Sequence, residues 1–396
     1  MTTAQSLLVF GAGADADSVR SALQDAGVTG VTVLEKPLLR SVFEDSTGTW
    51  ALYTADGDIV RAHVIVAAHP PADLPWTPNL PGHNEFGGDA FHAAAWDPHF
   101  HAAGRRIAVI GADSFAGHHL GRLVSCAESV TVFPHAPRRI VTDLQYWPAR
   151  ARNRLRRRHR AQRPGPQLGA TIGAVTSTGI RTVDGVEHPV DTIIYGTGFA
   201  LGAERALVGS RGLTLRDVWT DGMEPFFGVA VRGFPNCFFV SGPDRAVQVR
   251  YIAACFALMK RTGSARIEVR RSSQQVFNER AQLGPAAPPP VSSAFELSSS
   301  APDYEDTYDG TATLEIGGTS QPVHVRLIGH LDPLDGNYHW QGTIFDALPE
   351  ESVKRSRAAT LSVGDHSAPA RIVERTPWGT HSVAGVGKPP YAVSER

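Results

Sequence analysis

Two segments of this chain have the order strand, glycine-containing turn, helix, and they constrain its fold more than any other feature. The first runs from the apolar residues 6–10 into Gly11 and Gly13, and the second from residues 107–110 into Gly111. Glycine thus stands where a strand ends and a helix begins, which is the arrangement that holds the phosphates of a dinucleotide. The chain is therefore predicted to be an α/β protein with two Rossmann-like dinucleotide-binding domains.

The first segment has the residues that recognise the pyrophosphate and ribose of a dinucleotide. Gly11, Gly13 and Ala16 occupy the three small-residue positions of a G-x-G-x-x-G/A turn, and a second strand ends in Glu35, 24 positions after the first glycine. Gly11 permits the tight turn, Gly13 lets the backbone approach a pyrophosphate, and Glu35 can accept hydrogen bonds from ribose hydroxyls. A glycine turn without a ligand is the alternative, but the strand, helix, second strand and terminal acid together favour nucleotide binding.

A longer pattern lies between the two segments. Residues 86–97 (FGGDAFHAAAWD) have the form F-x-G-x-x-x-H-x-x-x-W-D, and its fixed positions are Phe86, Gly88, His92, Trp96 and Asp97. The pattern and the glycine turn after it resemble the signature of the flavin-containing and Baeyer–Villiger monooxygenases. The resemblance covers about residues 1–283 and implies FAD at the first turn and NADPH at the second. In that family the histidine couples the two nucleotide domains during closure, so His92 is the candidate catalytic residue.

Around the second turn the resemblance implies a set of NADPH-binding residues. Gly111, Ser114 and Ala116 are the candidates in the turn, and Arg138 and Arg139 follow the next predicted strand. A guanidinium fork matches the geometry of a phosphate, so one of the two arginines is expected to bind the 2′-phosphate of NADPH.

At one position the second turn departs from the family, because Asp113 replaces its middle glycine. A carboxylate opposes an anion at a helix N-terminus. Either Asp113 turns away as the helix N-cap, or this site binds NADP weakly. Farther along, the resemblance implies that the chain returns to the flavin domain near Gly198. A closing segment with Asp244 and a helix over 248–258 would then point at the cofactor.

Two parts of the family's pattern are missing. A β-hairpin begins at residue 42, soon after Glu35, where the family has a long segment that faces the flavin ring. The position of Trp50 in this hairpin predicts a strand residue. A basic run replaces the helical insertion that caps the family's active site, and it is either a solvated segment or an anion-binding one. Its arginines are Arg150, Arg152, Arg154, Arg156, Arg157, Arg158, Arg160 and Arg163.

Composition and turn signals divide the chain into domains. The resemblance assigns 1–80 and 199–283 to a shortened FAD-binding domain and 81–198 to an NADP-binding domain. Residues 284–300 are rich in proline and serine and are predicted to be a linker. Residues 301–396 contain short strands at close spacing, which predicts a small all-β barrel or sandwich.

The composition excludes several other classes of protein. The 396 residues are 42% hydrophobic and 19% charged, and the net charge of -1 gives no general attraction to nucleic acid or membrane. Three cysteines form neither a disulfide framework nor a metal set, which fits a reducing cytoplasm. No signal peptide or membrane span is expected, since no apolar run approaches the length of about 18–20 residues. The expected partner is a small-molecule substrate.

The resemblance implies an NADPH- and FAD-dependent monooxygenase that inserts oxygen into a ketone, amine or sulfide. The missing ring-facing segment favours two alternatives. One is a non-oxygenating relative that serves as a nucleotide-binding or regulatory protein. The other is a flavin reductase.

Overall fold

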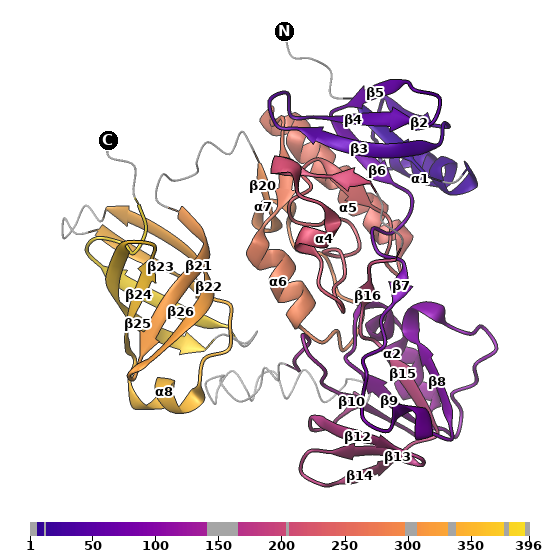
Figure 1. The fold of residues 1–396 in the computed structure, drawn as a ribbon, viewed down its shortest axis with the longest axis vertical. Coiled ribbons are helices and arrows are strands. Elements are labelled where there is room, and N and C mark those ends of the chain that lie inside the picture. The colour runs from indigo at the N-terminus through magenta and orange to yellow at the C-terminus, as the bar shows by residue number, and fades with distance from the viewer. Residues whose placement is uncertain are drawn as a thin grey trace. The chain divides into compact units, whose positions relative to one another are not determined.

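The computed structural model describes residues 6–11, 13–140, 165–202, 206–297, 307–331, 338–375 and 380–392. These residues form two compact units (Figure 1). The first unit takes the described residues within 1–140, 163–269 and 277–299, and the second takes those within 270–276 and 300–396. The arginine run 150–163 lies outside the described residues, so its two interpretations stay open.

A parallel four-stranded sheet in the order β18–β6–β1–β2 is the first half of unit one. Its strands are β1 (Leu7–Phe10), β2 (Val31–Leu34), β6 (Val64–Ala67) and β18 (Cys237–Phe239). Side chains alternate between the two faces of a strand, and in β1, β6 and β18 apolar residues at every position bury both faces. Helices α1 (Gly13–Asp25) and α5 (Arg245–Thr262) pack on one face. An antiparallel sheet of β3 (Leu38–Glu44), β4 (Thr49–Thr54) and β5 (Ile59–Ala62) covers the other.

The second half of unit one repeats this three-layer plan. Its parallel sheet has the order β11–β10–β9–β15–β8. The strands are β8 (Asp89–His92), β9 (Arg106–Ile110), β10 (Ser129–Phe133), β11 (Gln167–Leu168) and β15 (Thr192–Tyr195). Helix α2 (Ser114–Cys126) packs on one face. The antiparallel strands β12 (Ile172–Thr176), β13 (Gly179–Thr182) and β14 (Glu187–Pro189) pack on the other. The mixed α/β class predicted from the two glycine turns is confirmed.

The hairpin after β2 is present, and Trp50 lies on β4 as predicted. Its side chain is fully buried, and its indole N–H donates to the carbonyl oxygen of Pro235 at 2.9 Å. Residues 60–66, which were also predicted to belong to this hairpin, divide between two sheets. Strand β5 completes the hairpin, whereas β6 enters the parallel sheet.

The predicted linker 284–300 requires a correction. It contains helix α7 (Val291–Ala294) and strand β20 (Phe295–Leu297), which pairs antiparallel with β19 (Ile267–Val269). Phe295 is 1% exposed in the core beneath α5. Proline and serine are typical of a linker, but the short apolar run among them is buried, and this makes 291–297 part of the first unit.

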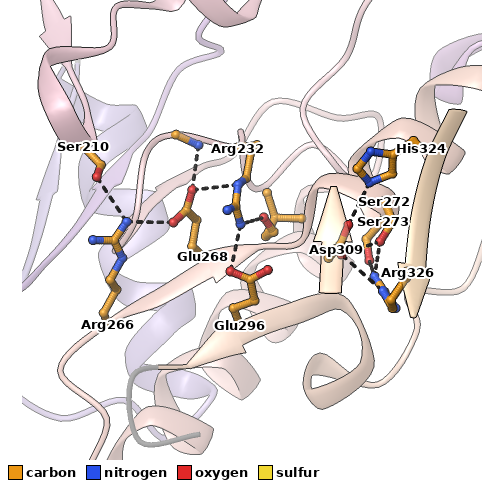
Figure 2. A network of polar contacts seen from close by, with 12 residues as sticks. Ser210, Arg232, Arg266, Glu268, Ser272, Ser273, Glu296, Asp309, His324 and Arg326 are labelled. Carbon is orange, nitrogen blue, oxygen red and sulfur yellow. Dashed lines mark hydrogen bonds and ion pairs between the residues drawn. The ribbon is translucent and has the colours of Figure 1, made fainter. Parts of the chain in front are cut away.

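Charged side chains hold β19 in place (Figure 2). Glu268 accepts from Arg266 at 2.9 Å and lies 3.2 Å from the Arg232 guanidinium, while Arg232 also bonds Glu296 on β20 at 3.0 Å. Glu268 is 6% exposed, and a buried carboxylate of this kind needs such partners. The network ties β19 and β20 to Arg232, which lies in the loop before β18.

The second unit is a closed six-stranded antiparallel barrel in the order β21–β22–β23–β26–β25–β24. Its strands are β21 (Thr307–Ile316), β22 (Thr319–Leu331), β23 (Tyr338–Ile344), β24 (Ala358–Val363), β25 (His366–Arg375) and β26 (His381–Val386). Alternate residues such as Leu314 and Val325 fill its core around Trp340. Of the two architectures predicted for this region, the barrel is the one observed.

A second polar cluster belongs to this unit (Figure 2). Asp309 accepts from His324 at 2.7 Å, from Arg326 at 3.2 Å and from Ser272 at 3.0 Å. Ser272 lies in helix α6 (Arg271–Glu279). Burial works to raise the pKa of the Asp309 carboxyl, but these hydrogen bonds and charges outweigh it and lower that pKa.

Candidate functional site

The turn after β1 forms one wall of an open cleft. Gly11, Gly13 and Glu35 line it together with residues of β3, and its volume is about 560 Å³. A methyl group at Gly11 would lie 2.9 Å from the Cβ of Ala68, so glycine allows β1 and the end of β6 to approach closely. A methyl group at Gly13 would meet no atom within 4 Å. This open space at the start of α1 is where a pyrophosphate can approach backbone N–H groups.

Ala16 lies beneath the cleft and is 1% exposed in the core between α1 and β1. A small residue there lets the helix pack close to the strand, which is what the third position of a G-x-G-x-x-G/A turn requires. Glu35 follows the end of β2 and is exposed, with its carboxylate available to a ligand in the cleft. The structure therefore brings together the residues that the sequence assigned to FAD at the first turn.

Acidic side chains near this turn have cations beside them. Asp15 lies 3.1 Å from the guanidinium of Arg245, and Asp17 lies 3.1 Å from that of Arg20. Both pairs are exposed, so they contribute little to stability. They do reduce the negative potential that a phosphate group would meet at the start of α1.

Asp244 is the N-cap of α5, and it accepts a hydrogen bond from the backbone N–H of Val247 at 3.1 Å. It also lines a hollow of about 130 Å³ that includes Ser114 and Gln248. Ligand pockets typically enclose about 300–1,000 Å³. The hollow is therefore small compared with the cleft at the first turn.

The turn after β9 is packed against the chain itself. Gly111 has a φ of 89°, and a methyl group there would lie 2.6 Å from the carbonyl oxygen of Gly196. A methyl group at Gly196 would lie 2.5 Å from the Cβ of Ala116. Backbone and Ala116 thus fill the space beside Gly111, as Ala68 does beside Gly11 in the first turn.

Asp113 is the N-cap of α2, as one of the two sequence-based alternatives predicted. Its carboxylate accepts from the backbone N–H of Ala116 at 2.8 Å and from that of Gly198 at 3.0 Å. The residue is fully buried. Gly198 is therefore placed here by its hydrogen bond to the α2 turn, and its φ of 78° suits glycine.

A second carboxylate, that of Glu224, also lies on the N-terminus of α2. It accepts from the backbone N–H of Ser114 at 3.1 Å and from the Ser114 hydroxyl. Arg138 donates to Glu224 at 2.9 Å and to the carbonyl oxygen of Gly222 at 2.8 Å. Asn278 accepts from the Glu224 backbone N–H at 2.7 Å and donates to its carbonyl at 3.0 Å. Glu224 and Arg138 are each 3% exposed.

This cluster confines two carboxyl groups and one guanidinium in a buried space. Burial raises the pKa of both the Asp113 and the Glu224 carboxyl, and for Glu224 the nearby charge of Asp113 adds to that increase. Arg138 acts in the opposite direction on both. Removing this cation would leave two buried carboxyl groups without a positive charge to offset theirs.

His92 contacts the same cluster from the end of β8. Its Nδ1 accepts from the backbone N–H of Ala94 at 3.1 Å, and its Nε2 lies 3.7 Å from Asp113 without a hydrogen-bond partner. Burial lowers the pKa of His92 to about 4, so the ring is neutral at pH 7. His92 therefore connects the segment 86–97 to the turn at the start of α2.

The residues assigned to NADPH from the sequence are engaged in internal contacts. Ser114 bonds Glu224, Arg138 forms a buried ion pair, and Arg139 lies 2.7 Å from Glu279. Binding of a phosphate by Arg138 would require separation of that buried pair. The open space at Gly13 and the exposed Glu35 suit the pyrophosphate and a ribose of FAD, whereas the groups assigned to NADPH at the second turn are engaged by the protein's own side chains.

Sequence reasoning did not identify Glu224 or Asn278. One signal was present, since Glu224 stands between Met223 and Pro225 in a stretch that continues with Phe226 and Phe227. A single ionisable residue in an apolar run is expected to be buried with a partner. The partner, Arg138, is 86 residues away and could not be deduced.

In the part of the chain that the structure describes, no helix has both the length and the apolar character needed to cross a bilayer.

Comparison with known proteins gives four findings. Residues 305–393 match a family described as Domain of unknown function (DUF4873). The chain is 25% identical over 338 residues to a Baeyer-Villiger monooxygenase of Pseudomonas aeruginosa, and the match covers 63% of this chain and 64% of that protein. It also resembles a closed crystal structure of cyclohexanone monooxygenase at 19% identity and a TM-score of 0.34, over 69% of this chain and 87% of the other.

A much closer relative is the uncharacterized protein Rv0943c of Mycobacterium tuberculosis. The two sequences are 60% identical over 309 residues, which is 76% of this chain and 89% of the relative. The chain therefore belongs to the same family as Rv0943c, and this family is distantly related to the Baeyer-Villiger monooxygenases.

Proposed function

We propose that this protein is an FAD-dependent oxidoreductase of the monooxygenase type, acting on a small organic molecule. The observation that carries the proposal is the cleft in which Gly11, Gly13 and Glu35 meet at the start of α1. Similarity to a Baeyer-Villiger monooxygenase supports the reaction class. The substrate would be a ketone, an amine or a sulfide.

In this proposal the chain's own groups bind and orient the cofactor. Backbone N–H groups at the start of α1 would hold the pyrophosphate, and Glu35 would accept hydrogen bonds from a ribose. Bound FAD supplies the redox chemistry, which the protein only positions. His92 would serve as a positioning residue, because it connects the 86–97 segment to the α2 turn through Asp113.

The test is a titration of the purified protein with FAD, followed by flavin fluorescence. The variant Gly13→Glu places a carboxylate in the open space before α1, where no atom lies within 4 Å, so it should fold normally. It should abolish binding, because a negative side chain would occupy the phosphate position. Unchanged FAD affinity in this variant would reject the site. Oxygenated product from a panel of ketones, amines and sulfides, with the flavin reduced chemically, would establish the reaction class.

A second candidate is a non-oxygenating relative that binds a nucleotide without turnover. The internal carboxylates at the α2 turn favour it, since the resemblance places the reductant there. The two candidates differ in one measurement. A chemically reduced, FAD-loaded protein that consumes oxygen but gives no oxygenated product from any tested class would favour the second.

A further inference from the structure

The N-terminus of α2 already carries anions that belong to the protein. The first turn of a helix presents backbone N–H groups that favour a negative group, and this is why dinucleotide phosphates bind there. In this chain the N–H of Ser114 donates to Glu224 and that of Ala116 donates to Asp113. Both carboxyl groups are buried, and they take the positions that a phosphate would need.

A cation is built into the same place. Arg138 bonds Glu224 at 2.9 Å and is itself almost completely buried. In a nucleotide site this guanidinium would face a phosphate of the ligand. Here it faces a carboxylate supplied by residue 224, and Asn278 fixes the backbone of that residue through two hydrogen bonds. The anion, its cation and its support are all parts of the chain.

The turn after β9 is also tightly packed, and a buried side chain occupies its middle position. Gly111, Gly196 and Ala116 are in such close contact that no side-chain atom could be added at either glycine without a clash. Asp113, at the position where a glycine would let a phosphate reach the backbone, is fully buried. In the first turn Gly11 is also closely packed, against Ala68, but the position that corresponds to Asp113 is Gly13, which has open space beside it.

We infer that Glu224 is a resident anion that closes the second nucleotide turn, so that this protein binds no nicotinamide dinucleotide there. Nucleotide binding is confined to the first turn. An FAD-loaded form would then depend on an electron donor that does not dock at α2. The closure of the second turn does not rest on the proposed function, because it concerns residues that take no part in the FAD cleft, whereas the statements about the first turn and the FAD-loaded form do rest on it.

The test uses two measurements on the full chain. The first is a calorimetric titration with NADP⁺ in the Gly13→Glu variant, in which only the α2 turn could bind a dinucleotide. We expect no saturable binding up to about 1 mM, the weak end of specific affinities. Saturable binding at roughly 100 µM or tighter would overturn the inference.

The second measurement asks whether the Glu224 position is an anion site. The Glu224→Ala variant removes the resident carboxylate and leaves Arg138 and the Ser114 N–H facing the vacated space. Acetate should raise its melting temperature more than chloride does at equal ionic strength, by binding only the folded state. The wild type and the control Glu279→Ala, which removes the partly exposed partner of Arg139, should show no such difference. An acetate effect of equal size in all three proteins would contradict the inference. If Glu224→Ala does not fold, the NADP⁺ titration decides alone.

Discussion

Arg138 and Glu224 form an ion pair with 2.9 Å between Nη2 and Oε2, and their side chains are 1% and 4% exposed. The pair joins the loop after β10 to the segment before β18, which are far apart in the sequence. Because both groups are buried, each depends on the other for its stability in the folded state.

Replacing Arg138 should therefore destabilise the fold strongly. Arg138→Leu leaves two buried carboxyl groups without a cation, which should lower the free energy of unfolding by about 3–5 kcal/mol. The matched change Arg139→Leu affects a partly exposed pair and should cost less than about 1 kcal/mol. Urea denaturation of both variants measures the difference. Equally small losses would place Arg138 at an accessible surface and would revive its assignment to the 2′-phosphate of NADPH.

FAD is expected to bind weakly. The segment that would cover the flavin ring is missing, and losing about 100 Å² of apolar burial corresponds to about 2.5 kcal/mol. The purified protein should contain less than one FAD per chain, and added FAD should raise its melting temperature. Glu35→Gln should weaken FAD roughly tenfold by removing a charge-assisted hydrogen bond. The melting temperature of the FAD-free form should not change, since Glu35 is exposed. A protein isolated with one tightly bound FAD per chain would show this prediction to be wrong.

Two glycines near the α2 turn should respond in opposite ways to alanine. Gly111→Ala introduces a methyl group 2.6 Å from a carbonyl oxygen at a φ of 89°, so it should destabilise the protein by more than about 2 kcal/mol. Gly121 lies within α2, and a methyl group there meets nothing within 4 Å. Gly121→Ala should stabilise the protein by about 0.5–1 kcal/mol through helix propensity. Thermal denaturation of the two variants provides the comparison, and a stable Gly111→Ala protein would mean that the turn is more open than described.

His92 should make the stability of the protein depend on acid pH. Burial lowers its pKa from 6.5 to about 4. Between these values the unfolded chain binds a proton at this residue and the folded chain does not, so falling pH favours unfolding. Above about pH 6.5 neither state is protonated and the effect disappears.

The variant His92→Asn isolates this contribution, because its side-chain oxygen can still accept from Ala94 but does not titrate. The stability of the wild type relative to the variant should decrease by about 3 kcal/mol from pH 7 to pH 4. Urea denaturation at several pH values measures it, and the comparison cancels the titration of Asp113 and Glu224 to first order. A difference that is independent of pH would mean that the pKa of His92 is the same in the folded and the unfolded chain.

Features encoded by neighbouring residues could be predicted from the sequence. The first turn is an example, since Gly11, Gly13 and Glu35 belong to one βαβ unit and their spacing alone brings them to one cleft. The N-cap role of Asp113 was one of two local alternatives, and the barrel strands followed from their close spacing between turn residues.

Features that depend on contacts between residues far apart in the sequence could not be predicted. Nothing near Arg138 indicates that its partner is Glu224, so the guanidinium was assigned to a ligand and the carboxylate was overlooked. The same holds for the segment around Phe295. Its proline- and serine-rich surroundings predict a linker, whereas its role as a strand depends on pairing with the distant β19. In both cases burial decides the role, and burial is a property of the whole fold.

The closure of the C-terminal barrel limits how other molecules can recognise it. Each of its six strands, β21 to β26, is hydrogen-bonded to a neighbour on both sides. A partner therefore has no continuous strand edge to extend, and peptide recognition by strand addition is excluded along the paired stretches. Any specificity must come from side chains and loops. The same closure lets such a module be joined to another domain without adding an edge that recruits other chains into aggregates.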